Sequence, residues 1–215
     1  MILTDKEIRD YVGADIPLIE NFKEESLQSE SYDLSLGKVV SRLDSKFKIL
    51  RLDQQETIDN LYLREKVPDS GYLLGPGEYI LISVEEKINM PEHLTAHIRP
   101  RTKFTRVGLL VSGQHCNSSY SGNLSLGLYN ATPFSICIKP GMKVAQIVFE
   151  ELRSVPSRQK QYREKSSAVF QNETLIRGSD FGNESINKLQ DLEGNPDAQK
   201  AYQSLIDGLK RRDRE

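Results

Sequence analysis

Short apolar segments recur about every ten residues through most of this 215-residue chain, and turn residues separate them. The first of these segments, Tyr32–Leu36, alternates with a period of two and ends at Gly37. Such spacing is typical of antiparallel strands and unlike alternating strands and helices. We expect further strands at residues 47–52, 72–74, 78–84, 94–98, 109–111, 124–129, 134–138 and 144–149. The pattern therefore predicts a mainly β fold, either a barrel or a sandwich.

A short helix should precede the first strand. Thr4 and Glu7 have the spacing of a capping box, and Ile8, Tyr11 and Val12 follow at helical intervals.

The chain changes character after Glu150. Residues 153–183 are rich in polar side chains, so we expect an extended arm there, after a β domain at 1–152. Residues 184–215 should form a helical extension, because apolar side chains return to one helical face near its end. These side chains are Ala198, Tyr202, Leu205, Ile206 and Leu209.

Composition excludes several classes of protein. The formal net charge is −2, which argues against a coat for nucleic acid or a membrane-surface binder. No apolar run is long enough to span a bilayer, and the N-terminus lacks the pattern of a signal peptide. Two cysteines are too few for a disulfide scaffold, so we expect a cytoplasmic protein.

The charge is unevenly distributed. No Asp or Glu occurs from His93 to Phe149, and this window carries a formal charge of +6. Its densest part is the segment Arg99–Arg106, with four cations and two threonines and an apolar, glycine-punctuated stretch directly after it. Arginine guanidinium groups and threonine hydroxyls suit phosphate oxygens, so an anion site is expected here. A solvated basic face is the alternative.

A polar loop at residues 114–122 is the second candidate for a site. His115 and Cys116 are adjacent there, and their spacing alone does not make them a catalytic pair. His115 could be structural or catalytic, and Cys116 is expected to be a small buried residue. The sequence has no zinc-ligand pattern, zinc-deaminase signature or nucleotide-binding glycine loop.

Four segments, in this order, resemble the motifs of the dCTP deaminase branch of the dUTPase superfamily. They are residues 31–37 (SYDLSLG), 101–109 (RTKFTRVGL), 120–130 (YSGNLSLGLYN) and 140–149 (PGMKVAQIVF). The resemblance extends from residue 1 to about residue 175. It implies a distorted β barrel of the jelly-roll type, a homotrimer with nucleotide sites between subunits, and Mg²⁺ carried by the nucleotide triphosphate.

The resemblance also implies roles for single residues. Arg101, Thr102, Lys103 and Arg106 match a phosphate-binding motif in which Lys103 replaces a serine. Gln146 matches a glutamine near the nucleotide, Tyr120 matches an aromatic residue that packs on deoxyribose, and Gln171 resembles a glutamine of the C-terminal arm.

Both catalytic positions of the family differ in this chain. Gly127 stands where the deaminases have a glutamate that activates water, and Asn117 stands where related enzymes have an aspartate. A glycine has no side chain, and an amide cannot act as a base at neutral pH.

Three functions remain open at this point. The protein could bind a pyrimidine deoxynucleoside triphosphate with ordinary deamination lost or altered. It could be an active, zinc-independent enzyme on another or modified nucleotide, with His115, Asp33 or Glu30 as a replacement group. It could also be a trimeric interaction protein that acts through its C-terminal helix. Neither a protein-held metal nor nucleic acid is expected.

Overall fold

The computed structural model describes residues 1–46, 49, 50, 52, 58, 60–165, 167–174, 176 and 179. The strands are β1 (Ile19–Glu20), β2 (Tyr32–Leu43), β3 (Tyr62–Lys66), β4 (Tyr72–Leu74), β5 (Tyr79–Asn89), β6 (Leu94–Pro100), β7 (Leu109–Val111), β8 (Gln114–Cys116), β9 (Ser121–Asn130), β10 (Ile136–Ile138) and β11 (Lys143–Glu151). The helices are α1 (Asp5–Val12) and α3 (Thr102–Arg106), with 3-10 turns η1 (Glu24–Ser26), η2 (Arg158–Lys160) and η3 (Tyr162–Glu164).

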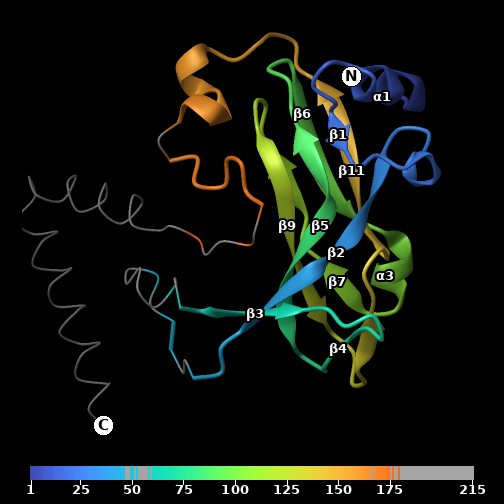
Figure 1. The fold of residues 1–215 in the computed structure, drawn as a ribbon, viewed down its shortest axis with the longest axis vertical. Coiled ribbons are helices and arrows are strands. Elements are labelled where there is room, and N and C mark those ends of the chain that lie inside the picture. Colours follow the sequence, from blue (N-terminus) through green and yellow to red (C-terminus); the bar gives the residue numbers. More distant parts are fainter. Residues whose placement is uncertain are drawn as a thin grey trace, which may run out of the picture.

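The main sheet has the strand order β7-β9-β5-β2-β11-β6-β8, with β1 added to β5 and β3 added to β2. A second sheet pairs β10 with β4, and all of these strand pairs are antiparallel. The main sheet curls into half of a barrel (Figure 1). The mainly β prediction is therefore confirmed.

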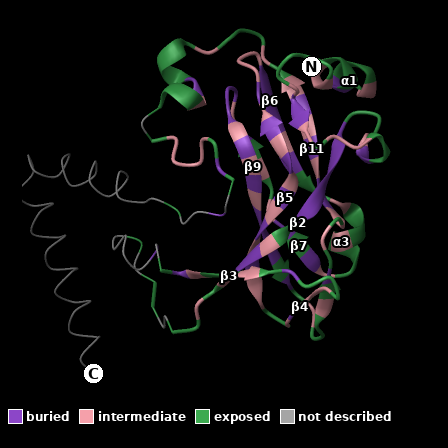
Figure 2. Cartoon of the chain, in the orientation of Figure 1, coloured by how far each residue is buried: buried purple, intermediate pink, exposed green. Residues whose placement is uncertain are grey.

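The core lies inside the curl of the sheet. In β5 every second side chain is buried, including Ile80, Ile82 and Ile88 (Figure 2). Fully burying an aliphatic side chain of this size contributes about 1.5–3 kcal/mol, so the alternation fixes which face of β5 points inward. Glu86 occupies one of the inward positions of this strand and is completely buried.

The predicted N-terminal helix is confirmed as α1. The Thr4 main-chain N–H donates to Glu7 Oε2 over 2.8 Å, and the Thr4 side chain completes the capping box by accepting from the Glu7 main-chain N–H. Ile8 is the residue that α1 buries in the core.

Several elements differ from the sequence expectation. Residues 114–116 form β8 rather than a loop, and the cationic segment contains the helix α3. Strands β1 and β3 were not expected. The predicted strand at 47–52 is wrong at residues 49, 50 and 52, which are not in a strand, and its other residues lie outside the described part of the chain. The whole helical extension at 184–215 also lies outside the described residues.

The beginning of the arm returns to the sheet after β11 ends. Its residues 158–164 form two 3-10 turns, and residues 171–173 lie beside the start of β9 (Figure 1). The three-part division at residues 152 and 183 stays a prediction. No helix in the described part of the chain is long and apolar enough to cross a membrane.

Candidate functional site

A first cluster of site residues forms around Arg101, and we call Arg101, Asp33 and Gln146 the Arg101 cluster. Asp33 on β2 and Gln146 on β11 are paired in register, and Arg101 Nη2 lies 3.2 Å from Asp33 Oδ2. Asp33 is only 1% exposed, so this ion pair is largely removed from solvent. Arg101 Nη1 also donates to the Lys143 carbonyl oxygen over 3.0 Å. The structure thus joins three of the motifs that are far apart in the sequence.

Helix α3 presents the other predicted phosphate ligands to solvent. Thr102, Lys103 and Arg106 are all exposed, and Arg101 is the N-cap residue of the helix. Gln146 is half-buried, and its Nε2 lies 3.5 Å from Ser31 Oγ. The cluster and α3 together offer guanidinium, ammonium and hydroxyl groups, which can bind an anion.

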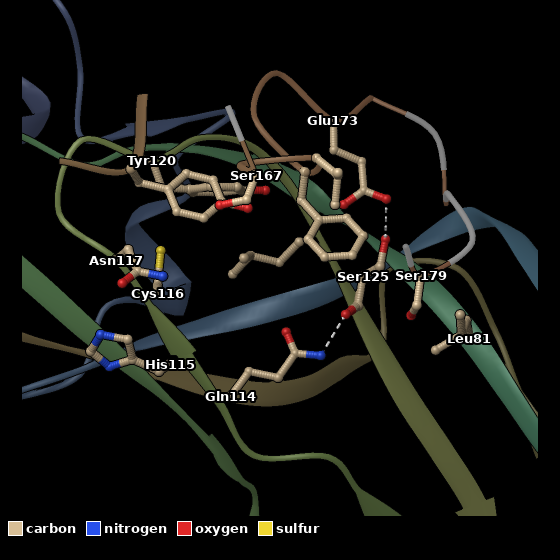
Figure 3. Close-up of a pocket in the computed structure, with 14 residues that line it drawn as sticks. Leu81, Gln114, His115, Cys116, Asn117, Tyr120, Ser125, Ser167, Glu173 and Ser179 are labelled. Atoms are coloured by element: carbon tan, nitrogen blue, oxygen red, sulfur yellow. Dashed lines mark hydrogen bonds between the residues drawn. The ribbon is translucent and has the colours of Figure 1, made fainter. Parts of the chain in front are cut away.

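A pocket of about 600 Å³ forms the second part of the candidate site, between β8, β9 and the arm (Figure 3). This volume lies in the usual range for small-molecule sites. His115, Asn117 and Tyr120 line it, and so do Tyr162 and Phe170 of the arm. None of the predicted phosphate ligands lines it. One chain therefore holds the two groups of predicted site residues at separate places.

His115 is exposed at the pocket wall. Its Nε2 lies 3.4 Å from Thr95 Oγ1, and its ring centroid is 5.0 Å from that of His97 on the paired strand β6. Desolvation, together with the neighbouring His97, lowers the pKa of His115 below its ordinary value. The neutral imidazole is thereby favoured, and it can donate or accept a hydrogen bond.

Tyr120 and Cys116 form the buried side of the pocket. Tyr120 is 6% exposed, its hydroxyl donates to the Asn123 carbonyl oxygen over 3.2 Å, and its ring meets Tyr162 edge to face. Burial raises the pKa of the Cys116 thiol to about 12, so this residue is a small buried side chain rather than a ready nucleophile. Asn117 is half-buried at the same wall.

Gly127 lies on β9 directly against Tyr79 of the paired strand β5. A Cβ atom at position 127 would lie 2.8 Å from Tyr79 Cε2 and 2.9 Å from Tyr79 Cζ, and it would meet the Tyr79 hydroxyl even more closely. Real Cβ atoms essentially never make such contacts. The space that a side chain at position 127 would need is therefore filled by a tyrosine ring.

Gln171 fixes the arm to the loop before β9. Its Oε1 accepts from the Ser121 main-chain N–H over 3.2 Å, and its Nε2 donates to the Ser119 carbonyl oxygen over 3.3 Å. Gln171 is not among the residues that line the pocket.

Asp33 and Glu30, the two acidic residues considered as replacement groups, also do not line the pocket. Asp33 belongs to the Arg101 cluster, and the Glu30 side chain contacts the Ser29 hydroxyl at an exposed position. The acid that does enter the pocket is Glu173 of the arm. Glu173 was not predicted as a site residue, because the polar arm shows no periodicity that would place residue 173 beside β9. The only signal was its position two residues after Gln171.

The described residues contain no group of three or more His, Cys, Asp or Glu side chains that could hold a metal ion.

The curled antiparallel sheet brings the four sequence motifs into one domain. The dCTP deaminase-like family model matches residues 2–152, and this chain belongs to that family.

Two relatives are both described as "dCTP deaminase, dUMP-forming". The protein from Hydrogenobaculum sp. (strain Y04AAS1) is 32% identical, over 73% of this chain and 86% of the relative. The protein from Corynebacterium glutamicum (strain R) is 31% identical, over 72% of this chain and 82% of the relative.

A solved structure supports the fold. The 2′-deoxycytidine 5′-triphosphate deaminase from Agrobacterium tumefaciens matches with a TM-score of 0.58 and 21% sequence identity. The match covers 70% of this chain and 48% of the solved chain, so this chain spans about half the length of that structure.

Proposed function

We propose that this protein binds a deoxynucleoside triphosphate, with a pyrimidine base, and that ordinary dCTP deamination is lost or strongly reduced. The observation that most directly supports the loss of deamination is the Tyr79 ring, which fills the space beside Gly127. The resemblance assigns a water-activating glutamate to position 127, and the Tyr79 ring would have to move before such a side chain could be accommodated. Asn117, at the other family position, can orient water but cannot deprotonate it.

The binding part of the proposal rests on the groups that this chain retains. Arg101, Thr102, Lys103, Arg106 and Gln146 hold the phosphates. Tyr120 packs on the sugar beside Asn117, while Gln171 keeps the arm closed over the pocket.

The separation of the pocket from the phosphate ligands supports sites between subunits. A homotrimer would bring the α3 surface of one subunit to the pocket of the next. Exposed apolar side chains at the β7–β9 edge, Leu110 and Tyr129, are available for such contacts.

In this proposal Mg²⁺ is carried by the triphosphate. The Asp33 carboxylate is buried and paired with Arg101, so it is not positioned as a metal ligand. The ion would keep phosphate oxygens and water as its ligands, which is the usual arrangement for Mg²⁺ with nucleotides. Its positive charge would offset part of the triphosphate charge next to the α3 cations.

Calorimetric titration of the full chain with dCTP, dUTP and dTTP, each with Mg²⁺, tests the binding. We expect saturable binding of at least one nucleotide, which Arg106→Ala weakens because a phosphate contact is lost. Leu43→Ala serves as the control. Leu43 is an exposed apolar residue of β2 that belongs neither to the predicted phosphate ligands nor to the pocket. Absence of binding for all three nucleotides would contradict the proposal.

An active enzyme on another or modified pyrimidine nucleotide is the second candidate. The observation in its favour is that a neutral His115 and the Glu173 carboxylate line the same pocket. Product analysis over a panel of deoxynucleotides separates the two candidates. The third possibility, an interaction protein that acts through its C-terminal helix, concerns residues outside the described part of the chain and stays a prediction.

A further inference from the structure

His115 and His97 face each other on adjacent strands at the rim of the pocket. The two residues are paired in register between β8 and β6, and their ring centroids are 5.0 Å apart with an angle of 52° between the rings. His115 lines the pocket, whereas His97 does not. Figure 3 shows His115 at the end of the pocket away from Glu173. The histidine pair is therefore separate from the acidic part of the wall.

The Thr95 hydroxyl identifies which ring nitrogen of His115 carries the proton. Thr95 is buried on β6, and its Oγ1 donates to the Cys116 carbonyl oxygen over 3.0 Å. The same oxygen lies 3.4 Å from His115 Nε2. A threonine hydroxyl has only one proton, so Oγ1 acts as the acceptor in its contact with His115. This hydrogen-bond network assigns the proton of the neutral imidazole to Nε2.

The assignment leaves Nδ1 as the acceptor of the His115 ring. Nδ1 makes no hydrogen bond to any residue in the described part of the chain, and the side chain is exposed at the pocket wall. A neutral imidazole has one donor and one acceptor nitrogen, whereas an imidazolium has two donors. Protonation of His115 would therefore change its free nitrogen from an acceptor into a donor.

Two neighbouring side chains act on the proton affinity of His115 with opposite sign. Desolvation is the largest cause of the lowered pKa of His115, the nearby His97 is the second, and Glu150 on β11 opposes both. Glu150 Oε1 lies 4.0 Å from His97 Nε2, so the carboxyl group is next to the pair.

Further titratable groups belong to the elements around this wall, and none of them contributes to the lowered pKa of His115. They are Arg99 of β6, Cys116 of β8, and Tyr162 and Glu173 of the arm. The face shared by β8, β6 and β11 therefore keeps His115 mainly neutral at pH 6.5, the ordinary pKa of a histidine.

We propose that Thr95 and His97 are positioning residues that hold the His115 imidazole neutral and as the Nε2–H tautomer. Nδ1 then presents a hydrogen-bond acceptor to a ligand or a water molecule in the pocket. The arrangement is a pH-sensitive switch, because acidification replaces this acceptor with an N–H donor. A ligand that donates an N–H or O–H group to Nδ1 loses that hydrogen bond when His115 is protonated. The switch is a property of the protein without nucleotide and goes beyond the proposed function.

Nitrogen-15 NMR of the full chain with labelled histidine tests the tautomer between about pH 4 and pH 8. The chain has three histidines, so single substitutions assign each signal. At the upper end of this range we expect the His115 Nε2 signal at the shift of a protonated nitrogen and the Nδ1 signal at that of an unprotonated one. Thr95→Val removes the acceptor for the Nε2 proton, so both tautomers should become populated.

The same titration tests the role of His97. His97→Phe keeps a ring beside His115 but removes its charge, so the pKa of His115 should rise toward 6.5. Glu150→Gln should lower the pKa of His115 further, because the carboxyl group favours the protonated form. His93 is the internal control, since its Nε2 lies 2.7 Å from the Tyr11 hydroxyl, outside the pair. The His93 signal should titrate identically in these variants.

A His115 ring that carries its proton on Nδ1 at the upper end of the pH range overturns the role of Thr95. An unchanged pKa of His115 in His97→Phe overturns the role of His97. A His115 pKa at or above 6.5 in the unmodified protein overturns the switch without any variant. If His97→Phe does not fold, as judged by thermal unfolding, this last measurement and Glu150→Gln decide the question.

Discussion

Tyr79 and Gly127 form the contact that most affects the chemistry open to this chain. Gly127→Glu alone should not produce normal dCTP deamination, because the Tyr79 ring must move to admit the new side chain and Asn117 also differs from the family. We expect this change to destabilise the fold by about 1–3 kcal/mol, the usual cost of overpacking. Chemical denaturation and product analysis with dCTP measure the two effects.

The double variant Gly127→Glu with Tyr79→Ala is the matched comparison. Removing the ring vacates the space, so the double variant should recover part of the stability lost in the single variant. Near-normal deamination by Gly127→Glu alone would show that the rest of the site is intact. It would also show that the Tyr79 contact does not limit deamination.

Glu86 is a buried acid in the middle of β5. Its Oε2 accepts from the Ser35 main-chain N–H over 2.9 Å, and burial raises the pKa of its carboxyl above the ordinary value of 4.5. The folded protein therefore keeps this proton to a higher pH than the unfolded chain. The free energy of unfolding should fall as the pH rises from about 4.5 through the raised pKa of the folded state.

Glu86→Gln should remove this fall, because the amide does not titrate. Urea denaturation between about pH 4 and pH 8 compares the variants across the titration range of a carboxyl. Glu85→Gln is the control, since its side chain is partly exposed and paired with Lys23. The same pH slope in Glu86→Gln and in the unmodified protein would contradict this role for Glu86.

The sequence predicted some site residues better than others, and the reason is physical. His115, Asn117 and Tyr120 are neighbours in one loop and strand, so a local motif identified them together, and all three line the pocket. Glu173 enters the same pocket only through main-chain bonds to β9, about fifty residues earlier in the chain. Such long-range pairing leaves no pattern in the side chains of the arm.

The strands show the same contrast between local sequence patterns, which can be predicted, and long-range main-chain pairing, which cannot. β5 and β11 bury alternate side chains, so their apolar periodicity predicted them. β3 reads YLREK and β8 reads QHC, and neither contains an apolar alternation long enough to detect. Both are strands because an adjacent strand supplies main-chain partners, β2 for β3 and β6 for β8.

The attachment of the arm to β9 should fail when Gly122 gains a side chain. We expect Gly122→Ala to expose residues 160–174 to faster hydrogen exchange and proteolysis, because its Cβ would meet the Glu173 main chain. Gly141→Ala is the matched control: Gly141 also has a positive φ of 81°, but an added Cβ meets nothing within 4 Å. Equal exchange of the arm in the two variants would contradict the proposed attachment.

The proposed trimer concerns the molecule as a whole. Leu110 on β7 and Tyr129 on β9 are paired in register and are 47% and 39% exposed. Leu110→Asp should lower the mass measured by light scattering from that of a trimer toward that of one chain, because a charge would enter an apolar contact. Ile16→Asp, at another exposed apolar residue, should not change the mass. A monomeric unmodified protein would contradict the proposal.

We propose that this member of the dCTP deaminase-like family binds a deoxynucleoside triphosphate without ordinary deamination. One sample that contains the full chain, Mg²⁺ and dCTP can be used to measure both binding and deamination by mass spectrometry. Native mass spectrometry measures the nucleotide that stays bound to the protein. Mass analysis of the released nucleotide then shows whether its base is still cytosine. We predict retained nucleotide that is still dCTP after prolonged incubation at high protein concentration. Retained or released deoxyuridine nucleotide in amounts above the protein concentration would contradict the account.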